Sequence, residues 1–166
     1  MNILVTGAGG FLGSRLAAAL LAGAPGVPAV TTLVAVDTAA GGIDDPRVRW
    51  RTGTIADERF TQSVVEDDVD LVYHLAAVVS GQAEAEFDLG MRVNVDATRA
   101  LLDACRRLGK PPRFVFSSTL AVFGGPLPPV VPDDAAVVPQ SSYGSEKAIA
   151  ELQPKARSGI GLPSSD

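Results

Sequence analysis

The chain has 166 residues, of which 46% are hydrophobic and 20% charged, and its formal net charge is −5. These values fit one soluble α/β domain with a sizeable core, and the lack of a Lys/Arg cluster argues against nucleic acid or a membrane as a partner. The single cysteine, Cys105, excludes an internal disulfide. The sequence starts directly on an apolar run with no secretion signal, so we expect a cytoplasmic protein.

The first predicted unit is a strand, a glycine-rich turn and a helix. Residues 3–5 form a short apolar run, glycines follow at spacings of three (Gly7, Gly10 and Gly13), and apolar residues then recur at helical spacing. Gly7 permits a tight turn, Gly10 lets a pyrophosphate approach the backbone, and Gly13 lets the helix pack on the strand. Phosphates then lie at the helix N-terminus, where free N–H groups and the helix dipole favour negative charge. The unit predicts a mononucleotide-binding site, with a glycine-rich connection that binds nothing as the alternative.

A second strand is predicted over residues 31–36, and an acidic residue follows it. Glycines and prolines interrupt the apolar stretch of residues 16–36, which indicates a helix, a loop and a strand instead of a membrane span. Asp37 stands about twenty residues past the glycines, where a carboxylate suits the ribose hydroxyls of NAD and repels the extra phosphate of NADP. No Arg or Lys occurs in residues 38–42. We therefore predict NAD as the cofactor; the alternative is a polar residue that only ends the strand.

Strands and helices alternate through the rest of the chain. We expect strands over residues 48–52, 70–75 and 113–117, a short helix capped by Asp57, a long helix over residues 84–107, and a surface loop over residues 124–139. This alternation predicts a Rossmann-like, doubly wound parallel sheet of the α/β class with strand order 3-2-1-4-5. Ligands bind such folds at the carboxyl edge of the sheet. The glycine turn, Asp37, Ala76 and Ser118 are all expected on this edge.

Tyr143 and Lys147 are the clearest candidates for chemistry. They stand four residues apart, so on a helix they share a face, and a nearby ammonium stabilises a phenolate for use as a general base. Ser117, Ser118 and Thr119 end the preceding strand, where a hydroxyl can hold a substrate oxygen opposite the phenol. The alternative for this spacing is a tyrosine and a lysine that only share a surface of the protein.

The other reactive residue types indicate packing. Cys105 lies in a helical pattern without an evident base nearby, as a small buried hydrophobe does. His74, the only histidine, ends an apolar strand and is expected to be packed or bonded to the backbone. No cluster of His, Cys and carboxylates has metal-ligand spacing, so we predict no metal site.

These motifs together resemble a known family. The segments are TGAGGFLG (residues 6–13), the acid at Asp37, HLAA (74–77), VN (93–94), SST (117–119) and Tyr143-x-x-x-Lys147. From residue 1 to about residue 152 they are similar to the extended short-chain dehydrogenases/reductases, the NAD-dependent epimerase/dehydratase group. The resemblance implies Tyr143 as base, Lys147 as the group that activates it and binds the nicotinamide ribose, and Thr119 with Ser118 as holders of the substrate hydroxyl. It also implies that NAD contacts both of these helix residues and the following set: Gly7, Gly10, Phe11, Leu12, Gly13, Asp37, Thr54, Ile55, Leu75, Ala76, Ala77 and Asn94.

Three functions are open within this resemblance. Residues 74–96, 117–128 and 132–152 look like a dehydrogenase that oxidises the secondary hydroxyl of a four-carbon sugar acid with NAD. A nucleotide-sugar epimerase or dehydratase shares the cofactor chemistry but needs a larger substrate pocket. An NAD-binding remnant without a substrate domain is the third hypothesis.

Two departures from the family pattern bear on these hypotheses. Thr54 stands where many relatives carry Asp near adenine, which weakens the expected adenine recognition. Gln153 and Pro154 are expected to interrupt the Tyr/Lys helix. We therefore expect a Rossmann domain over residues 1–152 and an irregular tail over residues 153–166, truncated before the last strands and a substrate domain. Because the family often forms homodimers through this helix and the next, we expect the helices of that interface to be incomplete here.

Overall fold

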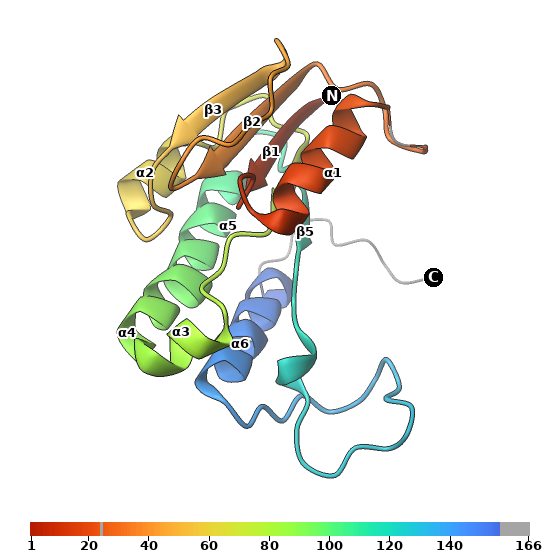
Figure 1. The fold of residues 1–166 in the computed structure, drawn as a ribbon, viewed down its shortest axis with the longest axis vertical. Coiled ribbons are helices and arrows are strands. Elements are labelled where there is room, and N and C mark those ends of the chain that lie inside the picture. Colours follow the sequence, from red (N-terminus) through yellow and green to blue (C-terminus); the bar gives the residue numbers. More distant parts are fainter. Residues whose placement is uncertain (24, 157–166) are drawn as a thin grey trace.

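The structure is a computed structural model that describes residues 1–23 and 25–156. Its centre is a parallel sheet with strand order β3-β2-β1-β4-β5, as predicted (Figure 1). The strands are β1 (Asn2–Thr6), β2 (Thr32–Asp37), β3 (Val48–Thr52), β4 (Leu71–His74) and β5 (Arg113–Phe116). Thr6 pairs with Val36 in β2 and with His74 in β4, so these three strands end together at one edge of the sheet.

The central strand β1 is buried on both faces. Ile3 and Val5 lie in one hydrophobic cluster with Ala17 and Leu20 of α1 (Phe11–Leu21). Leu4 points into the opposite cluster, which includes side chains of α5 (Ala97–Arg107). A strand covered on both faces needs an unbroken apolar run, since successive side chains point to opposite sides. This explains why the sequence of β1 is apolar throughout its centre.

The remaining helical segments lie beside the sheet or beyond its carboxyl edge. They are α2 (Glu58–Ser63), α3 (Ser80–Ala85), α4 (Phe87–Gly90), a π-helical segment (Met91–Asp96), a 3₁₀ turn (Leu120–Val122) and α6 (Ser142–Ala156). In Figure 1, α3, α4 and α6 lie below the carboxyl ends of the strands. The segments that follow β4 and β5 therefore build the end of the molecule that faces this edge.

The predicted segment 84–107 is helical except at Glu86, but it is not one continuous α-helix. Residues 80–107 form α3, α4, the π-helical segment and α5 in succession. The backbone leaves the helical region at Glu86, with φ −131° and ψ 67°. A single non-helical residue leaves the apolar spacing on either side nearly intact, so periodicity alone indicates one continuous helix.

The predicted interruption at Gln153 and Pro154 is wrong, because α6 continues to Ala156. Proline in the last turn removes one hydrogen-bond donor, but its fixed φ suits a helical backbone. The preceding turn is held in place, since Ala150 is fully buried and Gln153 Nε2 donates to the carbonyl oxygen of Val95 at 3.4 Å. Residues 157–166 of the predicted irregular tail lie outside the described residues.

Two other predictions about long segments are confirmed. Helix α1 ends at Leu21 and β2 begins at Thr32, so the apolar stretch of residues 16–36 is a helix, a loop and a strand. Among the described residues, no helix is long and apolar enough to cross a membrane.

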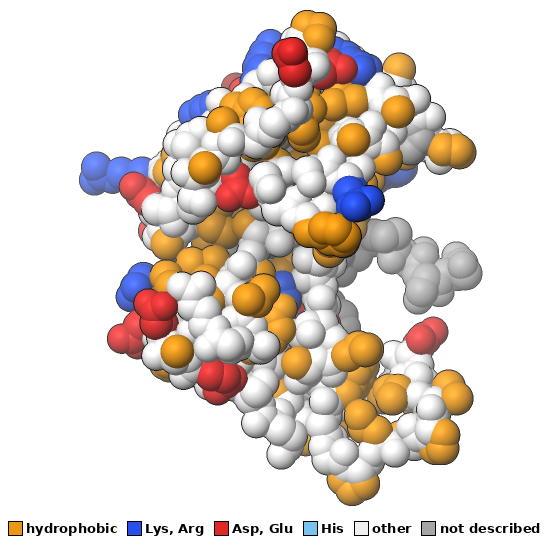
Figure 2. All heavy atoms as spheres, viewed as in Figure 1, with side chains coloured by type: hydrophobic (Ala, Val, Ile, Leu, Met, Phe, Trp, Pro, Cys, Tyr) orange, Lys and Arg blue, Asp and Glu red, His pale blue; other side chains and the backbone are white. Residues whose placement is uncertain are grey.

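The segment 124–139 contains no helix or strand, as predicted for a surface loop. Figure 2 shows hydrophobic side chains gathered on this loop, where Leu127 and Val130 are exposed; patches of this kind mark surfaces that contact a substrate, another domain or a partner.

Candidate functional site

The glycine turn after β1 has the close approaches that the sequence predicts. Gly7 has φ +72°, a left-handed conformation that favours glycine, and a Cβ there would lie 2.8 Å from the backbone nitrogen of Ala76. A Cβ on Gly13 would lie 2.0 Å from the carbonyl oxygen of Gly7, so α1 packs directly on the turn. A Cβ on Gly10 would meet only the Gly7 carbonyl oxygen, at 3.3 Å, so the outer side of Gly10 is open.

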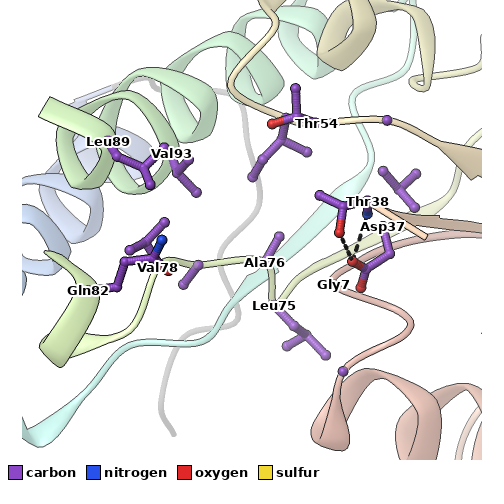
Figure 3. A pocket seen from close by; sticks show the side chains of 15 residues that line it. Gly7, Asp37, Thr38, Thr54, Leu75, Ala76, Val78, Gln82, Leu89 and Val93 are labelled. Atoms are coloured by element: carbon purple, nitrogen blue, oxygen red, sulfur yellow. Dashed lines mark hydrogen bonds between the residues drawn. The ribbon is translucent and has the colours of Figure 1, made fainter. Parts of the chain in front are cut away.

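A cavity of about 480 Å³ opens beside this turn at the carboxyl ends of β1, β2 and β4 (Figure 3). Ligand pockets are typically of this size. Many of the predicted cofactor residues line it: Gly7, Gly10, Asp37, Thr54, Ile55, Leu75, Ala76 and Ala77. The sequence-based prediction missed the remaining lining residues, which are Val36, Thr38, Gly53, Val78, Gln82, Leu89 and Val93. Several of these are direct neighbours of predicted residues in the sequence, which is the signal that could have found them.

Not all of the predicted cofactor residues belong to the cavity wall. Phe11 and Leu12 are exposed at the start of α1, with 73% and 62% of their surfaces accessible. Gly13 lies behind the turn, and Asn94 is 2% exposed and outside the wall as far as the described residues define it. A direct contact of these four residues with a cofactor stays a prediction.

Asp37 ties the end of β2 to the glycine turn. Its Oδ2 accepts a hydrogen bond from Gly9 N at 2.9 Å. Its Oδ1 accepts from Thr38 N at 2.7 Å and from Thr38 Oγ1 at 3.2 Å, as Figure 3 shows. The carboxylate is therefore held at the cavity rim beside the turn. A fixed negative charge there favours hydroxyl donors and disfavours a phosphate.

The turn after β3 forms another part of the cavity wall. Thr54 lines the cavity, and its Oγ1 accepts from Ala56 N at 3.2 Å within the turn. Asp57 caps α2 as predicted, because its carboxylate accepts from the backbone N–H groups of Arg59 and Phe60. The Thr54 hydroxyl is thus partly engaged by its own turn.

His74 is the centre of a buried hydrogen-bond chain, which confirms that it is a packed residue. Thr98 Oγ1 donates to the carbonyl oxygen of Asn94 at 2.8 Å, so it accepts from His74 Nε2 at 2.9 Å. His74 Nδ1 is then the acceptor for Thr6 Oγ1 at 2.7 Å, and that hydroxyl in turn accepts from Ala76 N at 3.3 Å. The chain links the cavity wall at Ala76 to the segment that carries Asn94.

Lys147 is buried beside this network. Only 2% of its surface is exposed, and its Nζ lies 4.0 Å from the centroid of the Phe116 ring, a cation–π contact. Burial lowers the pKa of Lys147 to about 8, against the opposing effect of the Glu151 carboxylate. Burial, together with the charge of Lys147, lowers the pKa of His74 to about 3. At neutral pH the lysine is thus mainly an ammonium, and the histidine is neutral.

The start of α6, which carries Tyr143, packs against the 3₁₀ turn that Thr119 begins. Tyr143 is half-buried in the first turn of α6, and its backbone N–H donates to Glu84 Oε1 at 3.2 Å. A Cβ on Gly144 would lie 2.2 Å from the carbonyl oxygen of Ala121, so this turn of α6 packs against the 3₁₀ turn. Thr119 begins that 3₁₀ turn, and its Oγ1 accepts from Ala121 N at 3.2 Å.

The predicted catalytic residues lie outside the lining of the cavity. Ser118 is exposed at the end of β5, and the Thr119 side chain is half-buried. Of the residues that the structure describes around the cavity, none of Tyr143, Lys147, Ser118 and Thr119 is part of its lining. Their roles in a reaction stay a prediction.

Cys105 has the packing role that its sequence pattern predicts. Cys105 is fully buried, and burial raises the pKa of its thiol to about 12, which keeps the thiol neutral. In residues 1–23 and 25–156, no group of three or more His, Cys, Asp or Glu side chains could hold a metal ion.

Comparison with known proteins decides the family. Residues 3–159 match the NAD dependent epimerase/dehydratase family. The chain belongs to this family. A D-erythronate dehydrogenase from Cupriavidus necator is 55% identical to it over 158 residues, which cover 92% of this chain and 49% of that protein.

Solved structures of similar proteins have the same fold. A nucleoside-diphosphate-sugar epimerase from Agrobacterium tumefaciens has a TM-score of 0.86 and 38% identity, over 94% of this chain and 48% of that one. A dTDP-glucose 4,6-dehydratase from Streptomyces venezuelae, solved with NAD and TYD bound, has a TM-score of 0.84 and 32% identity, over 94% and 51% of the two chains. The epimerase/dehydratase chain described here spans about half the length of each of these proteins.

Proposed function

We propose that this chain binds NAD in the 480 Å³ cavity and supplies the reactive side chains of a dehydrogenase for a small sugar acid such as D-erythronate. The observation that carries the proposal is the cavity between the glycine turn and Asp37, at the carboxyl edge of a doubly wound sheet. The 55% identity to a D-erythronate dehydrogenase supports the choice of substrate.

The residues around the cavity fit the charge pattern of NAD. The first N–H groups of α1 have no partner within the helix, and the open side of Gly10 leaves room for a pyrophosphate beside them. Asp37 is held at the rim as an acceptor for ribose hydroxyls. The apolar wall that continues to Val78 and Leu89 suits a ring system.

The proposed chemistry divides the substrate hydrogens between cofactor and protein. NAD, when bound, supplies the acceptor for the hydride that leaves the carbinol carbon. Tyr143 Oη takes the hydroxyl proton as general base, and the Lys147 ammonium stabilises the phenolate. Thr119, with Ser118, holds the substrate oxygen. The product is the corresponding keto acid.

A nucleotide-sugar substrate is the second candidate. It is favoured by the two solved structures, which are a nucleoside-diphosphate-sugar epimerase and a dTDP-glucose 4,6-dehydratase. The sugar acid is preferred because the identity to the D-erythronate dehydrogenase, 55%, exceeds the 38% and 32% of these two proteins.

The test combines binding and turnover on the purified chain. Trp50, the only tryptophan, packs on Gly41 next to the glycine turn, so we expect its fluorescence to respond to cofactor binding. We expect saturable quenching by NAD and, after addition of D-erythronate, an increase in NADH absorbance that the Tyr143→Phe variant lacks. Turnover of dTDP-glucose but not of D-erythronate would support the second candidate. Quenching without turnover of either substrate would support an NAD-binding unit that lacks its substrate domain, and a wild-type chain that does not bind NAD would overturn all three.

A further inference from the structure

The side chain of Asn94 holds the backbone of the cavity wall. Its Oδ1 accepts a hydrogen bond from Val78 N at 2.9 Å, and its Nδ2 donates to the carbonyl oxygen of Val78, also at 2.9 Å. Val78 lines the cavity, whereas Asn94 is buried behind it. The two bonds fix both backbone groups of one wall residue, so the position of the wall depends on the orientation of the Asn94 amide.

Glu146 holds the same amide from the side of α6. Asn94 Nδ2 donates its second hydrogen to Glu146 Oε2 at 2.6 Å. The carboxyl group is fully buried in α6, directly before Lys147 and three residues after Tyr143. With this bond the Asn94 amide uses its oxygen and both of its N–H hydrogens. An exchange of Oδ1 and Nδ2 would place like groups against each other, so the amide has one orientation.

The other oxygen of Glu146 packs against α4. Glu146 Oε1 is buried and has no hydrogen-bond partner. A Cβ on Gly90 would lie 2.3 Å from this oxygen, so only a residue without a side chain leaves room for the carboxyl group. Gly90 and Asn94 therefore confine the Glu146 carboxyl group between them.

We propose that Glu146 is a positioning residue, which locks Asn94 and through it the Val78 wall of the cavity to the helix that carries Tyr143 and Lys147. The inference rests on the proposed function, because it gives the wall the task of aligning the cofactor with those two side chains. It adds a residue of α6 that contacts neither the cavity nor the reacting atoms.

The surroundings of Glu146 indicate that its role depends on a hydrogen-bond acceptor oxygen more than on a negative charge. Burial raises the pKa of Glu146, the hydrogen bond from Asn94 opposes this, and the Glu84 carboxylate adds to it. A glutamine at this position keeps an acceptor for Asn94 Nδ2 at nearly the same volume. An alanine leaves a buried donor of Asn94 without a partner.

The test uses the whole chain with three variants and one control. Glu146→Ala removes the acceptor, Glu146→Gln keeps it, and Gly90→Ala displaces the carboxyl group from the opposite side. Ala150→Gly is the control, since it also weakens a buried position of α6 but removes no hydrogen-bonding group. The readouts are amide hydrogen exchange at Val78 without cofactor, and the Kd for NAD from Trp50 fluorescence.

We expect Glu146→Ala and Gly90→Ala to speed exchange at Val78 and to weaken NAD binding by about tenfold, the effect of one unsatisfied buried donor. Glu146→Gln should retain both properties, and Ala150→Gly should lower the melting temperature without changing either. Unchanged exchange at Val78 in Glu146→Ala and Gly90→Ala, or faster exchange with an unchanged Kd, overturns the inference. If the wild-type chain does not bind NAD, the proposed function and the alignment role fail together, while exchange at Val78 still decides whether Glu146 holds the wall.

Discussion

The glycine turn and the first turns of α6 are built in different ways. The turn is a local structure: Gly13 packs on Gly7, and Asp37 reaches back to Gly9. The start of α6 is held by distant segments, for example by Glu84, which is 59 residues away from Tyr143 in the sequence. The glycine turn with Asp37 is held mainly by contacts inside the first βαβ unit, whereas the start of α6 needs the whole described fold. We therefore expect that single substitutions can disturb cofactor binding and turnover separately.

The largest expected effect is on turnover alone. Replacing Tyr143 by Phe removes the general base, so kcat should fall by about 10²- to 10⁴-fold. The Kd for NAD should stay unchanged, because Tyr143 lies outside the cavity lining. The matched control is Tyr73→Phe, which removes the hydroxyl of the other tyrosine, in β4. Turnover of the Tyr143 variant at the wild-type rate would remove the catalytic role from α6.

The next largest effect disturbs the glycine turn. Gly13→Ala places a Cβ 2.0 Å from the carbonyl oxygen of Gly7. Overpacking of this kind should lower the free energy of unfolding by about 1–3 kcal/mol, and the displaced turn should bind NAD more weakly. Denaturant unfolding and the Trp50 titration measure the two effects. Gly109→Ala is the control, since a Cβ there meets no atom within 4 Å; equal behaviour of the two variants would contradict the packing argument.

A third prediction concerns pH and the buried His74, which lies between the two regions. The pKa of His74 falls from 6.5 in the unfolded chain to about 3 in the folded one, so between these values the unfolded state binds the extra proton. This contribution to stability is complete above pH 6.5 and is lost as the pH falls toward 3. Lys147 adds nothing to this slope, because with a folded pKa of about 8 it is protonated in both states there.

The corresponding measurement is the free energy of unfolding at several pH values. Between about pH 6 and about pH 5, stability should fall at a rate approaching 1.4 kcal/mol per pH unit. A His74→Gln variant should be less stable at neutral pH and should lack this slope, since no other histidine is present. A variant with the wild-type slope would show that another group takes up the proton.

The smallest expected effect sharpens the cofactor side. Thr54→Asp adds a charged acceptor to the cavity wall beside the turn after β3. A hydrogen bond to such a group should tighten NAD binding by roughly threefold to tenfold and leave kcat unchanged. Thr54→Val, which removes the hydroxyl, should weaken binding slightly. Weaker binding by the Asp variant would place adenine away from Thr54.

The same contrast explains what the sequence could predict. The strand order, the glycine turn, Asp57 as a helix cap and the packed His74 follow from local patterns, because each depends on residues near one another or on a regular alternation of elements. The break at Glu86 and the continuation of α6 through Pro154 do not, since they depend on one backbone conformation and on tertiary anchoring of Ala150 and Gln153.

The role of Asn94 shows the limit most clearly. The motif placed it at the cofactor groove, but its amide is engaged by Val78 and Glu146 behind the wall. Which buried partner a polar side chain finds is decided by long-range packing, in this case between segments 52 residues apart. Spacing in the sequence contains no signal for such a contact.

The most direct test of the account is a Trp50 fluorescence titration of the wild-type chain with NAD and, separately, with NADP. We expect saturable quenching by NAD and binding of NADP at least about tenfold weaker, because the Asp37 carboxylate repels the additional phosphate. Absence of saturable quenching by NAD, or equal affinity for the two cofactors, would contradict the assignment of the cavity.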